Sequence, residues 1–64
     1  MKIKLLVNEW FKEYEVLEVS KECFENSPQI ENAGTMTGFK INDEEHLNFL
    51  IQECKEKGFK EVKI

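Results

Sequence analysis

The chain contains no arginine, and its nine basic residues are all lysine. Arginine supplies the planar fork that reads guanine edges and clamps phosphates, whereas lysine acts there only as a point charge. Thirteen acidic residues bring the net charge to −4. An acidic chain without arginine is poorly suited to a nucleic-acid surface, so we expect no direct nucleic-acid binding.

Cysteine and histidine are almost as scarce, which removes most catalytic and metal chemistry. Cys23 and Cys54 are too few for a disulfide framework and too far apart for a Cys-x-x-Cys motif. Adding His46, the one histidine, still leaves a zinc site without ligand spacing or a fourth donor. No serine stands in a nucleophile signature. We therefore predict no catalytic, cofactor or metal site; whether the cysteines are free or bridged stays open.

Long hydrophobic runs are also missing, because no apolar run exceeds three residues. A membrane-spanning helix needs about 20 apolar residues, so we expect no membrane segment. The chain begins Met-Lys-Ile-Lys-Leu-Leu-Val-Asn, without the apolar region and cleavage site of a signal peptide. We expect the cytoplasm of a bacterium, or of the host cell if a phage encodes the chain.

Sixty-four residues form one domain, 1–64, near the lower limit for a self-supporting core. Either the packing is efficient or a partner, possibly a second copy, buries additional surface. A large enzymatic cleft is hard to build from so small a core, which favours a non-enzymatic function.

A helix over residues 43–57 is the clearest element of the sequence. Asn42 is a suitable N-cap, with Glu45 positioned for a capping box, and Gly58 is a suitable stop. Four apolar residues recur at the spacing of one helical face, and two of them should be fully buried, Leu50 and Ile51; the full set is Leu47, Leu50, Ile51 and Cys54.

Strands are predicted on both sides of this helix. Residues 2–7 alternate charged and apolar side chains, with Ile3, Leu5 and Val7 on one face, and residues 14–19 should pair with them as an antiparallel hairpin. The register of the second strand is ambiguous. Residues 20–26 form either a short helical turn capped by Ser20 or a continuation of that strand.

The second half of the chain predicts a β-α-β unit. Residues 26–38 are dense in turn formers and read as a long loop, although 35–37 could extend the next strand, 39–41. Residues 59–64 form the last strand, with Val62 and Ile64 facing inward. Strands 39–41 and 59–64 should be parallel, with a right-handed crossover. The predicted fold is a two-layer α+β domain, ββ(α)βαβ, with a mixed four-stranded sheet and one main helix packed on one face.

Aromatic and acidic residues are crowded together in residues 9–25, which carry six glutamates against two lysines. Strand alternation cannot bury every aromatic there, although Trp10 could instead cap the core. Phe49 falls on the polar face of the helix and is either covered by the 26–38 loop or exposed within an acidic rim. An apolar anchor ringed by charge is typical of a protein-binding hot spot. The predicted partner-binding residues are Glu9, Trp10, Glu13, Tyr14, Glu15, Glu18, Phe49 and Glu53.

The composition favours a non-enzymatic protein-binding module, most concretely an inhibitor or regulator that covers a basic, nucleic-acid-binding surface of a partner protein. Rows of carboxylates can imitate phosphate charge, as in a DNA mimic. Small acidic proteins of this composition are similar in style to phage or mobile-element inhibitors of host enzymes, although no motif carries that likeness. The alternatives are a homo-oligomeric structural module, such as a homodimer, and a small enzyme or enzyme subunit using the 26–38 loop.

Overall fold

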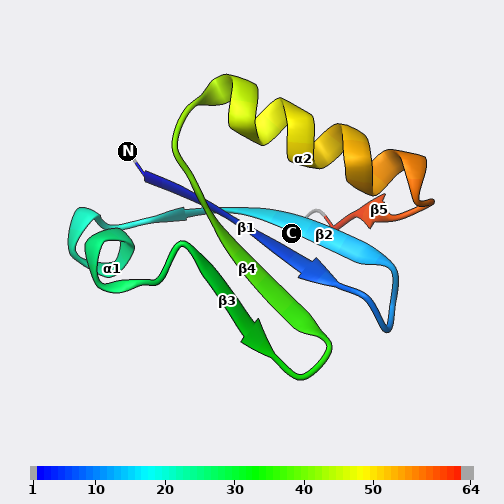
Figure 1. Ribbon diagram of the computed structural model, residues 1–64, viewed down its shortest axis with the longest axis horizontal. Coiled ribbons are helices and arrows are strands. Elements are labelled where there is room, and N and C mark those ends of the chain that lie inside the picture. The colour runs from blue at the N-terminus through cyan, green and yellow to red at the C-terminus, as the bar shows by residue number, and fades with distance from the viewer. Residues whose placement is uncertain (1, 63–64) are drawn as a thin grey trace.

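The first strand of the chain lies at the centre of a five-stranded sheet, with the strand order β3-β4-β1-β2-β5. A computed structural model describes residues 2–62 (Figure 1). One face of the sheet is covered by the long helix, so the domain has two layers. The elements along the chain are β1 (Lys2–Asn8), β2 (Glu13–Val19), α1 (Lys21–Asn26), β3 (Ile30–Ala33), β4 (Met36–Ile41), α2 (Glu44–Glu56) and β5 (Lys60–Glu61).

The predicted α+β architecture is confirmed, but the sheet has five strands instead of four. The additional strand is β3, which forms an antiparallel hairpin with β4 inside the segment expected to be a long loop. Gly34 adopts a positive φ of 65° between the two strands, a conformation that glycine reaches without steric cost. The turn formers of residues 26–38 therefore mark a tight turn and its flanks.

The β4-α2-β5 unit has the predicted parallel strands, but the two strands are not neighbours. β2 and β4 both run antiparallel to β1, and β5 runs parallel to β2 at the edge of the sheet. β1 and β2 therefore lie between β4 and β5. The ladder at β5 is short, and Val62 continues it by donating its N–H to the Tyr14 carbonyl oxygen at 2.8 Å. Ile64, also expected in this strand, lies outside the described residues.

The hydrophobic core fills the space between α2 and the sheet. Leu5 is fully buried at its centre, and the helix turns its predicted stripe toward it. The expectation that Leu50 and Ile51 are fully buried is wrong, because both are only partly buried. A single helix on a sheet leaves its flanks open to solvent. The buried core residues are Leu5, Val7, Tyr14, Ile41 and Cys54.

The N-cap of helix α2 lies one residue later than predicted. Asp43, not Asn42, is the N-cap, and its carboxylate accepts a hydrogen bond from the His46 N–H at 2.8 Å. The His46 side chain also takes part in the cap, because its Nδ1 atom accepts a hydrogen bond from the Asn42 N–H at 3.3 Å. This exchange resembles a capping box with histidine in the position that glutamate commonly takes. Gly58, with φ of 83°, ends the helix as predicted.

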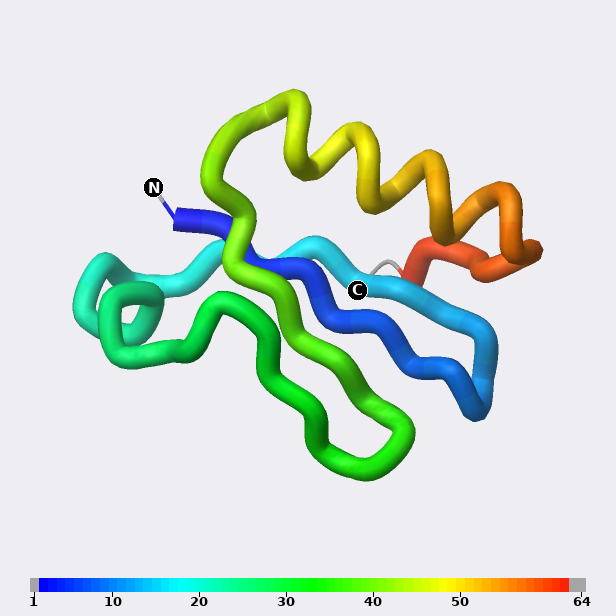
Figure 2. Tube along the Cα trace, viewed as in Figure 1, coloured from blue at the N-terminus to red at the C-terminus, as the bar shows by residue number. Residues whose placement is uncertain are grey.

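The short helix α1 closes one end of the sheet, opposite the β1–β2 turn (Figure 2). Ser20 caps it by accepting from the Cys23 N–H at 3.1 Å, which confirms the helical alternative for residues 20–26. Its Phe24 ring lies under two ammonium groups, at 5.2 Å from Lys2 Nζ and 4.6 Å from Lys40 Nζ. These cation–π contacts connect the helix to two neighbouring strands.

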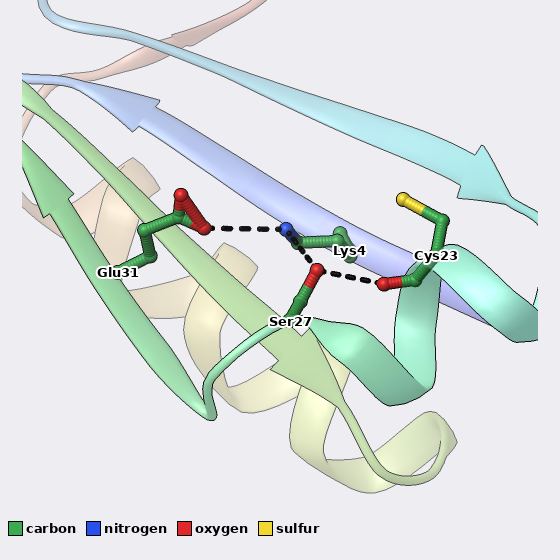
Figure 3. Close-up of polar contacts among 4 residues, drawn as sticks. All are labelled: Lys4, Cys23, Ser27 and Glu31. Carbon is green, nitrogen blue, oxygen red and sulfur yellow. Dashed lines mark hydrogen bonds and ion pairs between the residues drawn. The ribbon is translucent and has the colours of Figure 1, made fainter.

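A half-buried lysine holds the segment that follows α1 in place (Figure 3). The Lys4 Nζ atom donates to Ser27 Oγ at 3.2 Å and lies 3.8 Å from a Glu31 carboxylate oxygen. Ser27 Oγ in turn donates to the Cys23 carbonyl oxygen at 2.8 Å. The Lys4 side chain is only 13% exposed, so these partners compensate a charge that water reaches only in part.

Candidate partner-binding surface

The turn between β1 and β2 has a fixed backbone. The Asn8 side-chain oxygen accepts hydrogen bonds from the N–H groups of Trp10 and Phe11, each at 3.0 Å. This is an Asx turn, in which a side chain replaces a backbone acceptor. Lys12 closes the turn with φ of 55°, the left-handed conformation that few non-glycine residues adopt. The local sequence therefore sets the path of the chain through the tip.

The same turn is attached to the body of the domain on two sides. The Glu9 N–H donates to the Thr35 carbonyl oxygen at 3.0 Å, and the Lys60 N–H donates to the Lys12 carbonyl oxygen at 2.9 Å. The Lys12 ammonium group also lies 5.7 Å from the centre of the Phe59 ring. The turn is thus held by both the β3–β4 hairpin and the segment after α2.

Two large aromatic side chains project from this braced turn. Trp10 is 75% exposed and Phe11 is 67% exposed. The possibility that Trp10 caps the core is therefore not realised. A side chain on a backbone that is already ordered loses less entropy on binding than one on a mobile loop. We call Glu9, Trp10 and Phe11 the aromatic tip.

Helix α2 places acidic and aromatic side chains near the tip. Glu53 and Glu9 line the same cavity, of about 80 Å³, between α2 and the sheet, and Lys57 lines it too. Phe49, one helical turn before Glu53, points away from the core and is 61% exposed. The 26–38 segment, now known as a hairpin, leaves Phe49 exposed within its acidic rim.

The remaining predicted residues lie elsewhere, so the eight do not form one surface. Tyr14 is 2% exposed and belongs to the core, because its register partner is Val7 on the face under α2. This burial removes Tyr14 from any surface contact. Glu13 and Glu15 flank it in β2 and therefore project from the opposite face of the sheet. Glu18 lies on the α2 side, near the far end of β2.

The cavity beside the tip contains a thiol with little nucleophilic character. Cys54 lines it and is buried, and this burial raises its pKa; Lys57 lowers the pKa and Glu53 raises it. A raised pKa keeps the thiol protonated near neutral pH, whereas the thiolate is the reactive form. Within residues 2–62, no three histidine, cysteine or acidic side chains converge as metal ligands would.

Sequence reasoning missed two exposed apolar residues. Phe11 was not among the predicted contacts, although the asparagine two residues before Trp10 is the signal of an Asx turn that presents both aromatics. Ile30 is 56% exposed on the edge strand β3, and its segment has no alternating pattern that would have indicated a strand.

No helix within residues 2–62 combines the length and the apolar character needed to cross a membrane. Comparisons of the chain with protein-family models, curated proteins and solved structures find no match. The surface geometry is therefore the basis for assigning a function.

Proposed function

We propose that the chain is a non-enzymatic protein-binding module that inserts its aromatic tip into an apolar pocket of a partner protein. The proposal rests mainly on the exposure of Trp10 and Phe11, at 75% and 67%, on a turn whose backbone is held by hydrogen bonds. Tryptophan and other aromatics dominate binding hot spots because they bury a large area with few rotatable bonds.

Charge indicates the character of the partner. The net charge is −4, and two acidic residues, Glu9 of the tip and Glu53 of α2, line one cavity. A pocket edged by basic groups would match this arrangement, and the field of the acidic chain would speed the encounter. In its most concrete form, the module is an inhibitor or regulator of the phage type that covers a basic, nucleic-acid-binding surface in the cytoplasm.

The outer side of α2 extends the same contact. Phe49 is 61% exposed, and acidic residues share its side of the helix at Glu45, Glu53 and Glu56. Carboxylates at these positions form a row along the helix and could take the place of phosphates in a basic cleft. Glu13 and Glu15 project from the other face of the sheet, so a partner seated on the tip and α2 would not contact them.

An enzymatic role has less support. The cavity that contains Cys54, at about 80 Å³, is far smaller than the roughly 300–1,000 Å³ of common ligand pockets. A larger hollow near α1, at about 320 Å³, has Lys2 and Asp43 as its ionisable lining residues. The Cys54 thiol has a raised pKa, which disfavours covalent catalysis.

The test is a comparative pull-down from the source cell, or from its host, with mass spectrometry of the retained proteins. We expect a partner that is retained by the wild type and lost by Trp10→Ala/Phe11→Ala. The matched control is Ile30→Ala, which removes an apolar side chain that is 56% exposed on the far strand β3 and should retain the partner. A partner that survives loss of both tip aromatics would overturn the proposal.

With the purified partner, kinetics separate the two parts of the contact. Truncation of Trp10 should speed dissociation and cost about 2 kcal/mol or more. Charge reversal at Glu9 and Glu53 should mainly slow association, and added salt should mimic it as the Debye length falls from about 10 Å to about 3 Å. Competition with nucleic acid for the partner tests the inhibitor form.

A further inference from the structure

The face of the sheet turned away from α2 has a regular arrangement that the tip does not use. The register places neighbouring side chains in rows across the strands, and successive residues of each strand alternate between the two faces. We call this side the open face. Its members are Lys2, Lys4, Leu6 and Asn8 of β1, Glu13, Glu15, Leu17 and Val19 of β2, Glu31 and Ala33 of β3, Met36, Gly38 and Lys40 of β4, and Lys60 and Val62 at β5.

The open face contains a depression that apolar side chains line together with Glu13 and Glu15. Leu6, Met36 and Val62 line this depression, of about 200 Å³, and all three are half-buried. Val62 was expected to face the core, but it lies here. Gly38 stands beside Leu6 in the neighbouring strand and presents no side chain.

The two halves of the open face carry opposite net charge. Three lysines gather at the α1 end, where Lys4 and Lys40 are direct cross-strand partners and Lys2 lies one row further. Like charges placed opposite each other are unfavourable, and Glu31 offsets only part of this group. Glu13 lies at the other end with Lys60 beside it, and Glu15 lies one row nearer the lysines, beside Leu6. The half of the face near α1 is therefore basic, and the half near the β1–β2 turn is acidic, with apolar side chains in both.

We propose that the open face binds a second copy of this chain in a two-fold symmetric dimer. In such a dimer the same patch occurs on both sides, so it must be complementary to itself. A two-fold axis lying in the interface, perpendicular to the line from the lysines to the glutamates, brings each basic half over the partner copy's acidic half. Leu6 lies between Lys4 and Asn8 on the central strand and is then close to the axis. The charge pattern of the face satisfies this requirement without a second protein.

The size of the domain points in the same direction. A 64-residue chain buries a smaller fraction of its surface than a larger domain does, and among residues 2–62 only Leu5 has a fully buried side chain. Pairing two open faces would place a second apolar layer on the far side of β1. The aromatic tip projects from the β1–β2 turn, so each copy would keep its own tip for a partner.

The first experiment measures molar mass by light scattering and sedimentation velocity from micromolar to millimolar concentration. We expect the mass of a dimer, with dissociation favoured by salt because the end charges are near the rim. A chain that stays monomeric throughout this range would overturn the proposal.

Charge reversal then tests the geometry. The variant Glu13→Lys/Glu15→Lys makes both halves basic, and Lys2→Glu/Lys40→Glu makes both halves acidic. Each variant alone should dimerise at least about tenfold more weakly than the wild type, because like charges meet in both halves. An equimolar mixture should form a heterodimer. Lys4 is left unchanged because it is held by Ser27 and Glu31.

The matched control for the glutamate variant is Glu53→Lys/Glu56→Lys, which makes the same change in net charge on α2. It should dimerise as the wild type does, and so should Trp10→Ala/Phe11→Ala, which separates this interface from the partner contact. Equal weakening by the control, or a dimer that resists both reversals on the open face, would overturn the proposal. Circular dichroism checks the fold of each variant. Lys2 and Lys40 both contact the Phe24 ring, so Lys2→Glu/Lys40→Glu could unfold the protein; Met36→Glu then takes its place.

Discussion

The side chain of Leu6 lies across Gly38 on the neighbouring strand: a Cβ atom built on Gly38 would stand 3.3 Å from the Leu6 Cδ2 atom. That separation is below ordinary van der Waals contact, so the leucine occupies space that a larger residue would need. Glycine within a strand weakens it, since its backbone loses more freedom on folding. The packing of Leu6 against the bare backbone offsets part of that loss.

Gly38→Val should therefore destabilise the protein, because the branched side chain forces Leu6 away from its position. We expect the free energy of unfolding to fall by roughly 1–3 kcal/mol in urea denaturation. Adding Leu6→Ala to this variant should cost less than Leu6→Ala costs in the wild type, because the clash has gone. Additive effects of the two substitutions would contradict the contact.

The cap of α2 can be tested by two neighbouring alanine substitutions. Asp43→Ala should lower the free energy of unfolding by about 0.5–2 kcal/mol, because the His46 N–H loses its acceptor. Asn42→Ala is the control, since Asn42 contributes only its backbone N–H to the cap. Thermal melts of both variants measure the difference, and equal losses would argue against Asp43 as the cap.

The core can be tested by comparing two leucines. Leu5 is fully buried, so Leu5→Ala should cost roughly 2–5 kcal/mol, whereas Leu50→Ala should cost less because Leu50 is partly exposed. In so small a domain, the first variant should lose cooperative unfolding near room temperature. A larger loss for Leu50 would place the centre of the core on the helix and not on β1.

The two cysteines are free thiols in different surroundings, which settles the question left open by their spacing. Cys23 is exposed and Cys54 is buried, and burial raises the pKa of Cys54. A thiol reagent at neutral pH should modify Cys23 in the native protein and Cys54 only after denaturation, without any reductant. Mass spectrometry counts the labels. Rapid labelling of Cys54 in the native state would mean that the cavity beside it opens readily.

Alkaline pH should weaken the fold through Tyr14. Burial raises its pKa, and the charges of Glu61 and Cys54 raise it further. The unfolded tyrosine ionises first, at about pH 10. Stability is therefore unaffected well below that pH and falls as pH rises through the ordinary tyrosine pKa toward the raised one. Tyr14→Phe should show a smaller loss in urea denaturation above about pH 9.5, with Cys54 adding a loss of the same sign from about pH 8.5.

The elements that rest on local signals were predictable. Helix α2 runs from Glu44 to Glu56 against a prediction of 43–57, because its apolar stripe and its glycine stop are both contained in the segment. Strand β3 was missed because all of its residues are exposed and no alternation marks it. β5 lies beside β2 because two segments far apart in the sequence pair with each other, and no local sequence pattern indicates such a pairing.

The same distinction between local signals and long-range pairing applies to the partner surface. The fate of Tyr14 depends on register: pairing with Val7 turns it toward α2, and a shift by one residue would have turned it outward. Because the sequence left the register of β2 ambiguous, it did not show whether Tyr14 faces the core or solvent. The exposure of Trp10 depends on the Asn8 side chain, whose hydrogen bonds direct the turn away from the core.

The position of Trp10 determines what its fluorescence can report. Indole emission responds to the polarity around the ring, and the one tryptophan of this chain is already 75% in water when the protein is folded. Denaturation will change its environment little, so its spectrum is a poor probe of unfolding. Burial of the tip would move the ring out of water and shift the emission to the blue. The emission wavelength of Trp10 therefore reports docking without an added label.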